Sequence, residues 1–168
     1  PLTEVFRFIE NGVEAGTFTE GLTQYQTSGQ VWTAFRDGQT DLAVTWLSNF
    51  LQEGPADAAL APFYPISNGA VSLGTGRAWA VATPHENRQT LAVDLAEFLV
   101  QTDFLAEWTN AAGYLPPRPS SLEGWQDQSL RATLSQVALM TQLRPSNGIL
   151  TTIGPIMREG VRQILQGT

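Results

Sequence analysis

A tryptophan followed by small polar side chains is the part of this sequence best suited to holding a small molecule. Trp46 lies near the end of an apolar run, and Ser48 and Asn49 follow shortly after it. An indole ring stacks on the apolar face of a sugar or similar ligand, while hydroxyl and amide groups bond its polar groups. A buried core position also explains Trp46, and on the sequence alone it is the slightly favoured interpretation.

The segment GTGRAW, residues 74–79, carries the first two glycines of a dinucleotide-binding fingerprint. That fingerprint needs a third small residue and the start of a helix, so that backbone amides meet the pyrophosphate. Trp79 occupies the third position, and the sequence after it continues as a predicted strand. We therefore expect no dinucleotide site. The glycines are expected to allow close backbone approach, either to a neighbouring strand or to a ligand.

Residues suited to catalysis or metal binding are sparse. His85 is the only histidine, in a TPHEN stretch typical of a turn, and neither a cysteine nor a G-x-S-x-G elbow occurs. Without a calcium loop either, we expect no metal and no cofactor. Asp94, Glu97 and Glu107 fall on polar faces of predicted helices, where solvation explains them. Carboxylate pairs from distant positions stay open, so a small glycoside hydrolase or esterase is the first alternative to a binding protein.

Three prolines follow a predicted helix end at Gly113. Pro116 to Pro119 match the P-x-x-P spacing of a polyproline II ligand. The stretch is therefore a flexible linker, a docking peptide for a partner domain, or a stiff loop that shapes a binding site. A protein-interaction module that uses this loop is the second alternative function.

The composition is that of a folded domain. The 168 residues are 42% hydrophobic and 15% charged, with a net charge of −7, and all nine basic residues are arginines. A nucleic-acid-binding protein would carry a basic stripe, which this sequence lacks, and the same charge disfavours an anionic membrane surface. No apolar run approaches the ~20 residues of a membrane span. Because the chain starts at Pro1 without a signal pattern, we expect a fragment or a trimmed chain.

Apolar periodicity predicts a helix-rich fold of the α/β or α+β class. Buried strands are predicted over Thr40–Leu47 and Val71–Thr83. Trp32 and Trp108 fall on the predicted core faces of helices. Pro155 falls in the last helix, where it either kinks the helix or marks its first turn. The predicted helices cover residues 3–15, 28–37, 91–101, 102–112, 130–138 and 149–164.

Taken in order, these segments resemble the family 1 extracellular solute-binding proteins of ABC importers, in their maltose-binding-protein-like, sugar-binding group. Residues 35–46, FRDGQTDLAVTW, are similar to that family's helix end, glycine turn, small-residue strand and tryptophan. Residues 73–122 resemble its longest signature, a glycine-containing strand followed by two helices and G-x-L-P-x-R. Residues 143–167 resemble its arginine-proline step and closing helix. The resemblance covers most of the chain.

The resemblance implies a type II periplasmic-binding-protein-like α/β fold, helix-rich with a short mixed sheet, whose two lobes close on a ligand without catalysis. It implies a small-molecule ligand, most simply a sugar, and ABC permease subunits as partners. The location would be periplasmic or extracellular, with any lipid anchor at an N-terminus outside this sequence. Because family members are longer, the resemblance implies that the chain corresponds to their C-terminal half, and the N-terminal part is expected outside this sequence. Residues 1–62 and 117–168 are then expected in the second lobe, and residues 63–116 in the first lobe and hinge.

Carried over position by position, the resemblance also implies a ligand site and no catalytic residue. A strand-end tryptophan lines the family's cleft, a glycine-containing turn meets the ligand, and an aromatic residue lies where the proline loop returns to the cleft. Arg118 either touches ligand or fixes that loop by pairing. The stretch 113–119 is then a stiff crossing. The expected ligand-binding residues are Trp46, Ser48, Asn49, Gly74, Thr75, Gly76, Arg77 and Tyr114.

Overall fold

The structure is a computed structural model of the chain, and it describes residues 2–62 and 71–167. The chain divides into two compact units. Unit 1 consists of Pro1–Val44 and Pro145–Thr168, and unit 2 of Thr45–Arg144. The predicted lobe boundary at residue 63 lies outside the described residues, so the predicted division into lobes stays a prediction.

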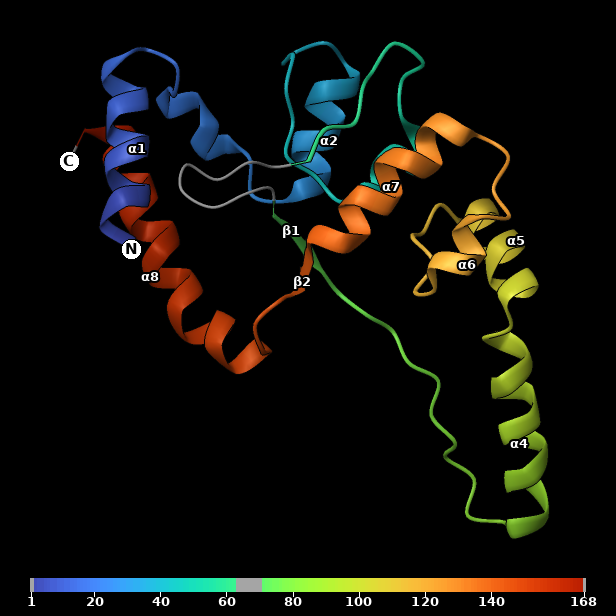
Figure 1. Cartoon of the computed structure of the whole chain (residues 1–168). Coiled ribbons are helices and arrows are strands. Elements are labelled where there is room, and N and C mark those ends of the chain that lie inside the picture. Colours follow the sequence, from blue (N-terminus) through green and yellow to red (C-terminus); the bar gives the residue numbers. More distant parts are fainter. Residues whose placement is uncertain (1, 63–70, 168) are drawn as a thin grey trace. The chain divides into compact units, whose positions relative to one another are not determined.

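Helices dominate the described residues, and one small parallel sheet accompanies them (Figure 1). This confirms the helix-rich part of the predicted fold class. In chain order the elements are α1 (Leu2–Glu14), a 3-10 helix (Glu20–Gln24), α2 (Ser28–Arg36), α3 (Leu47–Glu53), β1 (Ser72–Gly74), α4 (Glu86–Leu99), α5 (Thr102–Ala112), α6 (Pro119–Leu122), α7 (Gln128–Met140), β2 (Thr141–Leu143) and α8 (Asn147–Gln166).

In unit 1, α1 packs against α8, although the two helices come from opposite ends of the chain (Figure 1). Gly160 of α8 makes the approach close, because a Cβ there would lie 3.1 Å from the Phe6 ring of α1. The apolar spacing predicts both helices correctly. Pro155 lies inside α8 and not in its first turn.

Local sequence sets both ends of α2. Thr27, just before the helix, is its N-cap: the Thr27 hydroxyl accepts from the Gln30 N–H at 3.3 Å, and the Gln30 side-chain oxygen accepts from the Thr27 N–H at 3.2 Å. This reciprocal pair is a capping box. Gly38 follows the helix with a φ of +68°, as the sequence predicts for a closing glycine. Trp32 is 7% exposed, which confirms its predicted core position.

The core of unit 2 surrounds Leu122, Trp125 and Leu134, which are 4%, 3% and 0% exposed. Removing such apolar surface from water is the main favourable term in folding. Because residues of α3, α6 and α7 and of the loop after α5 all belong to this cluster, one core holds these elements together. The partly buried side chains packed against it are Leu47, Leu51, Leu60, Leu115 and Leu130.

The sheet differs from its prediction in extent, and among the described residues it is parallel and not mixed. β1 and β2 pair in parallel, with Gly74 opposite Leu143. The strand predicted over 71–83 is regular only within β1, and the following residues run without regular structure to α4. The strand predicted over 40–47 is wrong, because that stretch is irregular until α3 begins. A strand needs a neighbour for its backbone hydrogen bonds, and the described residues provide none there.

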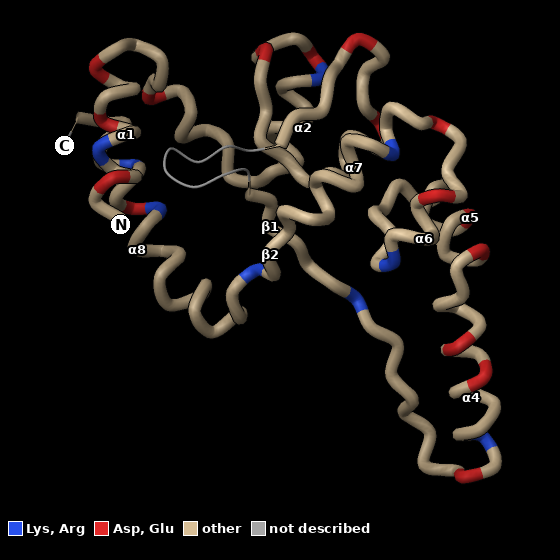
Figure 2. The backbone as a smooth tube through the Cα atoms, in the orientation of Figure 1, with Lys and Arg blue, Asp and Glu red and all other residues tan. Residues whose placement is uncertain are grey.

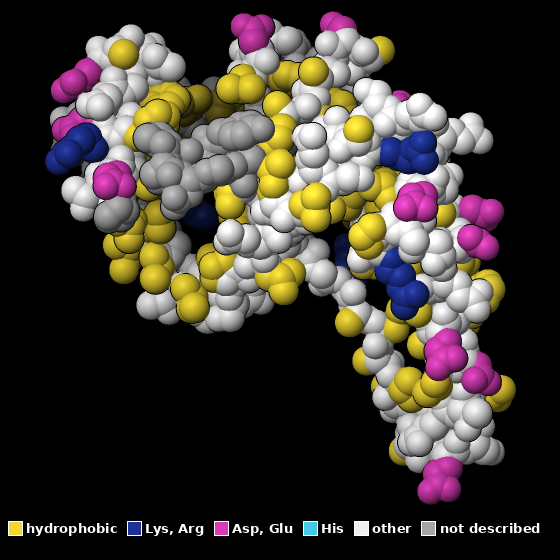
Figure 3. Space-filling view, in the orientation of Figure 1, with side chains coloured by type: hydrophobic (Ala, Val, Ile, Leu, Met, Phe, Trp, Pro, Cys, Tyr) yellow, Lys and Arg dark blue, Asp and Glu magenta, His cyan; other side chains and the backbone are white. Residues whose placement is uncertain are grey.

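Several helices keep apolar side chains on the surface (Figure 3). The stripe predicted for α4 is present but not covered, with Leu91 68%, Leu95 57% and Phe98 49% exposed. Trp108 of α5 is 43% exposed, so its predicted core position is wrong. Helical periodicity therefore identifies these helices correctly, but it does not show which apolar faces the described residues cover.

Charged side chains are spread thinly over the described chain (Figure 2). On α8, Arg162 pairs with Glu159 at 2.6 Å, and this hydrogen-bonded arginine lowers the pKa of the Glu159 carboxyl. The stabilisation is present above the ordinary carboxyl pKa of 4.5 and is lost as the pH falls through the lowered value. Because both groups are exposed, the pair contributes little to stability.

Candidate ligand-binding site

All of the expected ligand-binding residues lie in unit 2. Trp46 is the N-cap residue of α3 and does not end a strand. Its side chain is 41% exposed, so the ring is not buried in a core and is accessible. Ser48 and Asn49 lie half-buried in the first turn of α3, where Asn49 Nδ2 donates to Thr45 Oγ1 at 2.7 Å. The start of this short helix therefore carries an accessible indole ring, a hydroxyl and an amide held by Thr45.

The glycine-containing turn begins where β1 ends. Gly74 is required by the sheet, because a Cβ there would collide with the Thr141 side chain of β2. Of the two close approaches expected for these glycines, Gly74 therefore makes the one to a neighbouring strand. At Gly76, in contrast, an added Cβ would have nothing within 4 Å, and Thr75 and Arg77 are exposed. The backbone at Gly76 is consequently open to a ligand.

The structure brings Arg77 and Tyr114 together, although they are distant in sequence. The Arg77 Cζ atom lies over the Tyr114 ring, 5.4 Å from its centroid, which is within the range of a cation–π interaction. On α5, Trp108 stacks with Tyr114 at a centroid distance of 6.2 Å and an interplanar angle of 22°. We call Arg77, Trp108 and Tyr114 the aromatic–arginine cluster. It combines flat apolar surface with a cationic group.

A tight connection after α5 positions Tyr114. Gly113 has a φ of +67°, and the Tyr114 N–H donates to the Thr109 carbonyl at 2.9 Å. Such a left-handed residue ends many helices and satisfies their last carbonyl groups. From α3, Gln52 Nε2 donates to the Ala112 carbonyl at 2.8 Å. The segment that carries Trp46 is thereby joined directly to the loop that carries Tyr114.

The prolines after Tyr114 belong to the folded unit. Pro116 is buried, Leu115 packs against the core, and Pro119 is the first residue of α6. Proline suits that helix position because it has no N–H to leave unpaired and its φ is already helical. A polyproline ligand must be exposed and extended. Pro117, Arg118 and Pro119 are exposed, but Pro116 is buried and the helix that begins at Pro119 ends the extended run, which argues against the docking-peptide alternative. We interpret the stretch as a stiff loop.

The predicted residues are not all joined in one contact network. Among the described residues, no ring contact connects Trp46 with Tyr114. Sequence reasoning also misses Trp108, because its helical spacing indicates a core face. The sequence does hold one clue to Trp108. It lies in the last turns of α5, only a few residues before the expected ligand-binding residue Tyr114. Trp125, the buried tryptophan of the core, lies in a short loop where no periodicity marks it.

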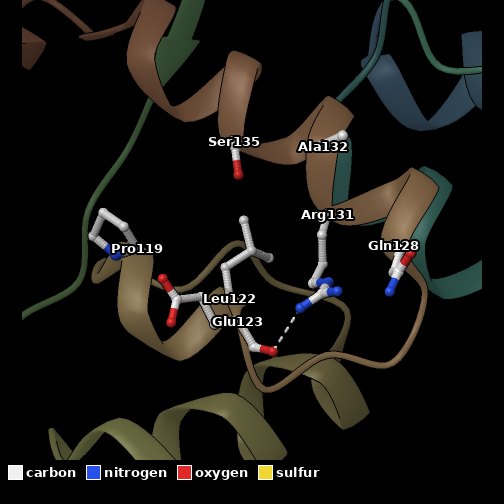
Figure 4. Close-up of a pocket in the computed structure, with 7 residues that line it drawn as sticks. All are labelled: Pro119, Leu122, Glu123, Gln128, Arg131, Ala132 and Ser135. Atoms are coloured by element: carbon white, nitrogen blue, oxygen red, sulfur yellow. Dashed lines mark hydrogen bonds between the residues drawn. The ribbon is translucent and has the colours of Figure 1, made fainter.

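A separate hollow lies between α6 and α7 (Figure 4). Its volume is about 280 Å³, and Leu122, Arg131 and Ser135 are among its lining residues. Arg131 Nη1 donates to the Glu123 carbonyl at 2.8 Å, which ties the two helices together at this point. No aromatic side chain and none of the expected ligand-binding residues line the hollow. The hollow therefore does not coincide with the expected ligand-binding residues.

The histidine and the possible metal ligands can be placed in the described part of the chain. His85 is the exposed N-cap residue of α4. Within residues 2–62 and 71–167, no three His, Cys, Asp or Glu side chains are grouped so as to hold a metal ion. In the same ranges, no helix combines the length and apolar character needed to span a bilayer.

Comparison with known families identifies the class of protein. Residues 2–133 match the model of a family described as bacterial extracellular solute-binding protein. Since the match covers most of the sequence, the chain belongs to this family. No curated protein and no solved structure matches the chain. The solute-binding part of the sequence prediction is thus confirmed, and the family's role is to bind solutes, not to catalyse reactions.

Proposed function

We propose that this chain is the substrate-binding component of an ABC transporter, and that its solute is a carbohydrate delivered to membrane permease subunits. The observation that carries the proposal is the aromatic–arginine cluster, set beside an open glycine turn in a member of a solute-binding family. Sugars present apolar C–H faces and many hydroxyls, and they are bound by aromatic rings with polar groups around them.

Each residue of the site has a part in this proposal. Trp46 and Tyr114 stack on the sugar rings, with Trp108 holding the Tyr114 ring in position. The Ser48 hydroxyl and the amide of Asn49 bond sugar hydroxyls. The open turn, with Thr75 and the backbone amides at Gly74 and Gly76, adds further bonds. A buried polar group left unpaired is costly, so these positions select one pattern of hydroxyls over another.

The proposed mechanism is hinge closure of two lobes in a type II periplasmic-binding-protein fold. Residues 1–62 and 117–168 belong to the second lobe in this scheme, and residues 63–116 to the first lobe and hinge. A ligand shifts the protein towards the closed state only as far as it binds that state more tightly. Aromatic faces that meet the sugar only on closure provide that difference. The proposed location is the periplasm or the cell exterior, where the permease receives the solute.

Removing either stacking ring is expected to weaken sugar binding. Calorimetric titration of the full-length protein with its sugar should show the dissociation constant rising about tenfold or more for Tyr114→Ala and for Trp46→Ala, since a lost aromatic contact costs roughly 1.4 kcal/mol or more. Trp79→Ala is the matched control, because this tryptophan is 61% exposed and makes no ring contact among the described residues. Unchanged affinity in Trp46→Ala and Tyr114→Ala would remove both rings from the site.

A further inference from the structure

We infer that the solute is an acidic saccharide, and that Arg77 binds its carboxylate. The inference rests on the proposed function, because it specifies the sugar that the same site would take. Its basis is the position of the Arg77 guanidinium, whose Cζ lies 5.4 Å from the centroid of the Tyr114 ring. The guanidinium covers one face of the Tyr114 ring and therefore borders the aromatic surface that is left for a sugar ring.

The contact with Tyr114 holds Arg77 without using its hydrogen-bond donors. A guanidinium above a ring interacts through its face, while its N–H groups point outward in the plane of the group. Segment 75–85 contains no acidic residue (Figure 2). Among the described residues, Arg77 forms no ion pair. The planar pair of donors is thus presented to a ligand, and it matches the two oxygens of a carboxylate.

Closure over the site makes the charge of the solute decisive. A charged group removed from water is strongly destabilised unless an opposite charge and hydrogen bonds compensate it. A neutral sugar bound against the cluster would leave the Arg77 guanidinium shielded from water and without a counter-charge. A uronate instead supplies a carboxylate next to a pyranose ring. One ligand then satisfies both the stacking ring and the cation.

Tryptophan fluorescence and calorimetry test this inference with defined ligands. The full-length protein is titrated with galacturonate and glucuronate di- and trisaccharides, and in parallel with the corresponding galactose and glucose oligomers. We expect at least one acidic series to bind about 10- to 100-fold more tightly than its neutral counterpart, as a bidentate charge-assisted pair provides. In Arg77→Gln that preference should fall to within about threefold, while binding of the neutral series should remain, since the rings are intact.

Arg88→Gln is the matched control, because Arg88 is an exposed arginine of α4 in the same unit and lies outside the cluster. It should keep the full preference for the acidic series. Equal binding of both series, or a preference that survives Arg77→Gln, overturns the inference and leaves the carbohydrate function standing. Binding of neither series by the unaltered protein overturns the proposed carbohydrate function and this inference with it.

Discussion

Leu134→Ala is expected to lower the free energy of unfolding by about 3 kcal/mol, the largest effect among the substitutions considered. Leu134 is fully buried on α7, in the cluster with Leu122 and Trp125. Truncation to alanine removes apolar surface and leaves a cavity that the packed neighbours fill only in part. Urea unfolding, followed by circular dichroism and by tryptophan fluorescence, measures the change.

The matched control for this substitution lies on the same helix. Leu139 is 88% exposed, so Leu139→Ala makes the same chemical change on α7 without opening a cavity. Its effect on the free energy of unfolding should stay within about 0.5 kcal/mol. Similar losses for Leu134→Ala and Leu139→Ala would contradict the assignment of the unit 2 core.

Gly113→Ala is expected to destabilise the protein by about 2 kcal/mol and also to weaken sugar binding, because Gly113 carries the turn that positions Tyr114. Two costs combine at this position. Its φ of +67° is unfavourable for any residue with a Cβ, and that Cβ would lie 2.5 Å from Gln52 Cγ and 3.3 Å from the Gln52 backbone nitrogen. Thermal unfolding measures the first effect and calorimetric titration the second.

Gly16→Ala separates the two costs. Gly16 has nearly the same φ, +71°, but nothing lies within 4 Å of its Cβ position. It should therefore show only the conformational cost of about 1 kcal/mol, with sugar affinity unchanged. If Gly113→Ala were no more destabilising than Gly16→Ala, α3 would not hold the turn as closely as the Gln52 contacts indicate.

The sequence predicts the longer helices of this protein well, because each of them carries its own signals, but it does not predict α3, α6 or the 3-10 helix. α7 shows apolar residues at helical spacing, and the two of them that the structure buries, Leu134 and Val137, both fall on the face that this spacing defines. α5 ends at Gly113 in the left-handed conformation that a terminal glycine favours. These features depend on residues within a few positions of each other, so the sequence alone is enough to locate them.

Strands and surface exposure depend on distant partners, and there the sequence is less informative. The three residues of β1 are a strand because Thr141 to Leu143 lie beside them, and nothing in the local sequence marks that pairing. The run over 40–47 is apolar enough for a strand but has no such partner among the described residues. In the same way, helical spacing places Trp108 on the apolar face of α5, but it does not show whether another element covers that face.

The contacts of the candidate site likewise depend on residues that are distant in sequence. The positions of Arg77 and Tyr114 follow from the family resemblance, but their contact requires the chain to fold back from the glycine turn to the loop after α5. The role of Trp108 beside them is visible only in three dimensions. The stiff proline loop, in contrast, is recognisable from sequence, because proline restricts the backbone wherever it occurs.

The central claim is that this member of the solute-binding family binds a carbohydrate at the aromatic–arginine cluster. Calorimetric titration of the full-length protein against a panel of neutral and acidic saccharides, amino acids, polyamines and metal chelates tests it most directly. We predict saturable binding of at least one saccharide with a dissociation constant in the micromolar range or below, about −8 kcal/mol or stronger, and its loss or marked weakening in Tyr114→Ala. Binding of amino acids, polyamines or metal chelates alone would contradict the claim.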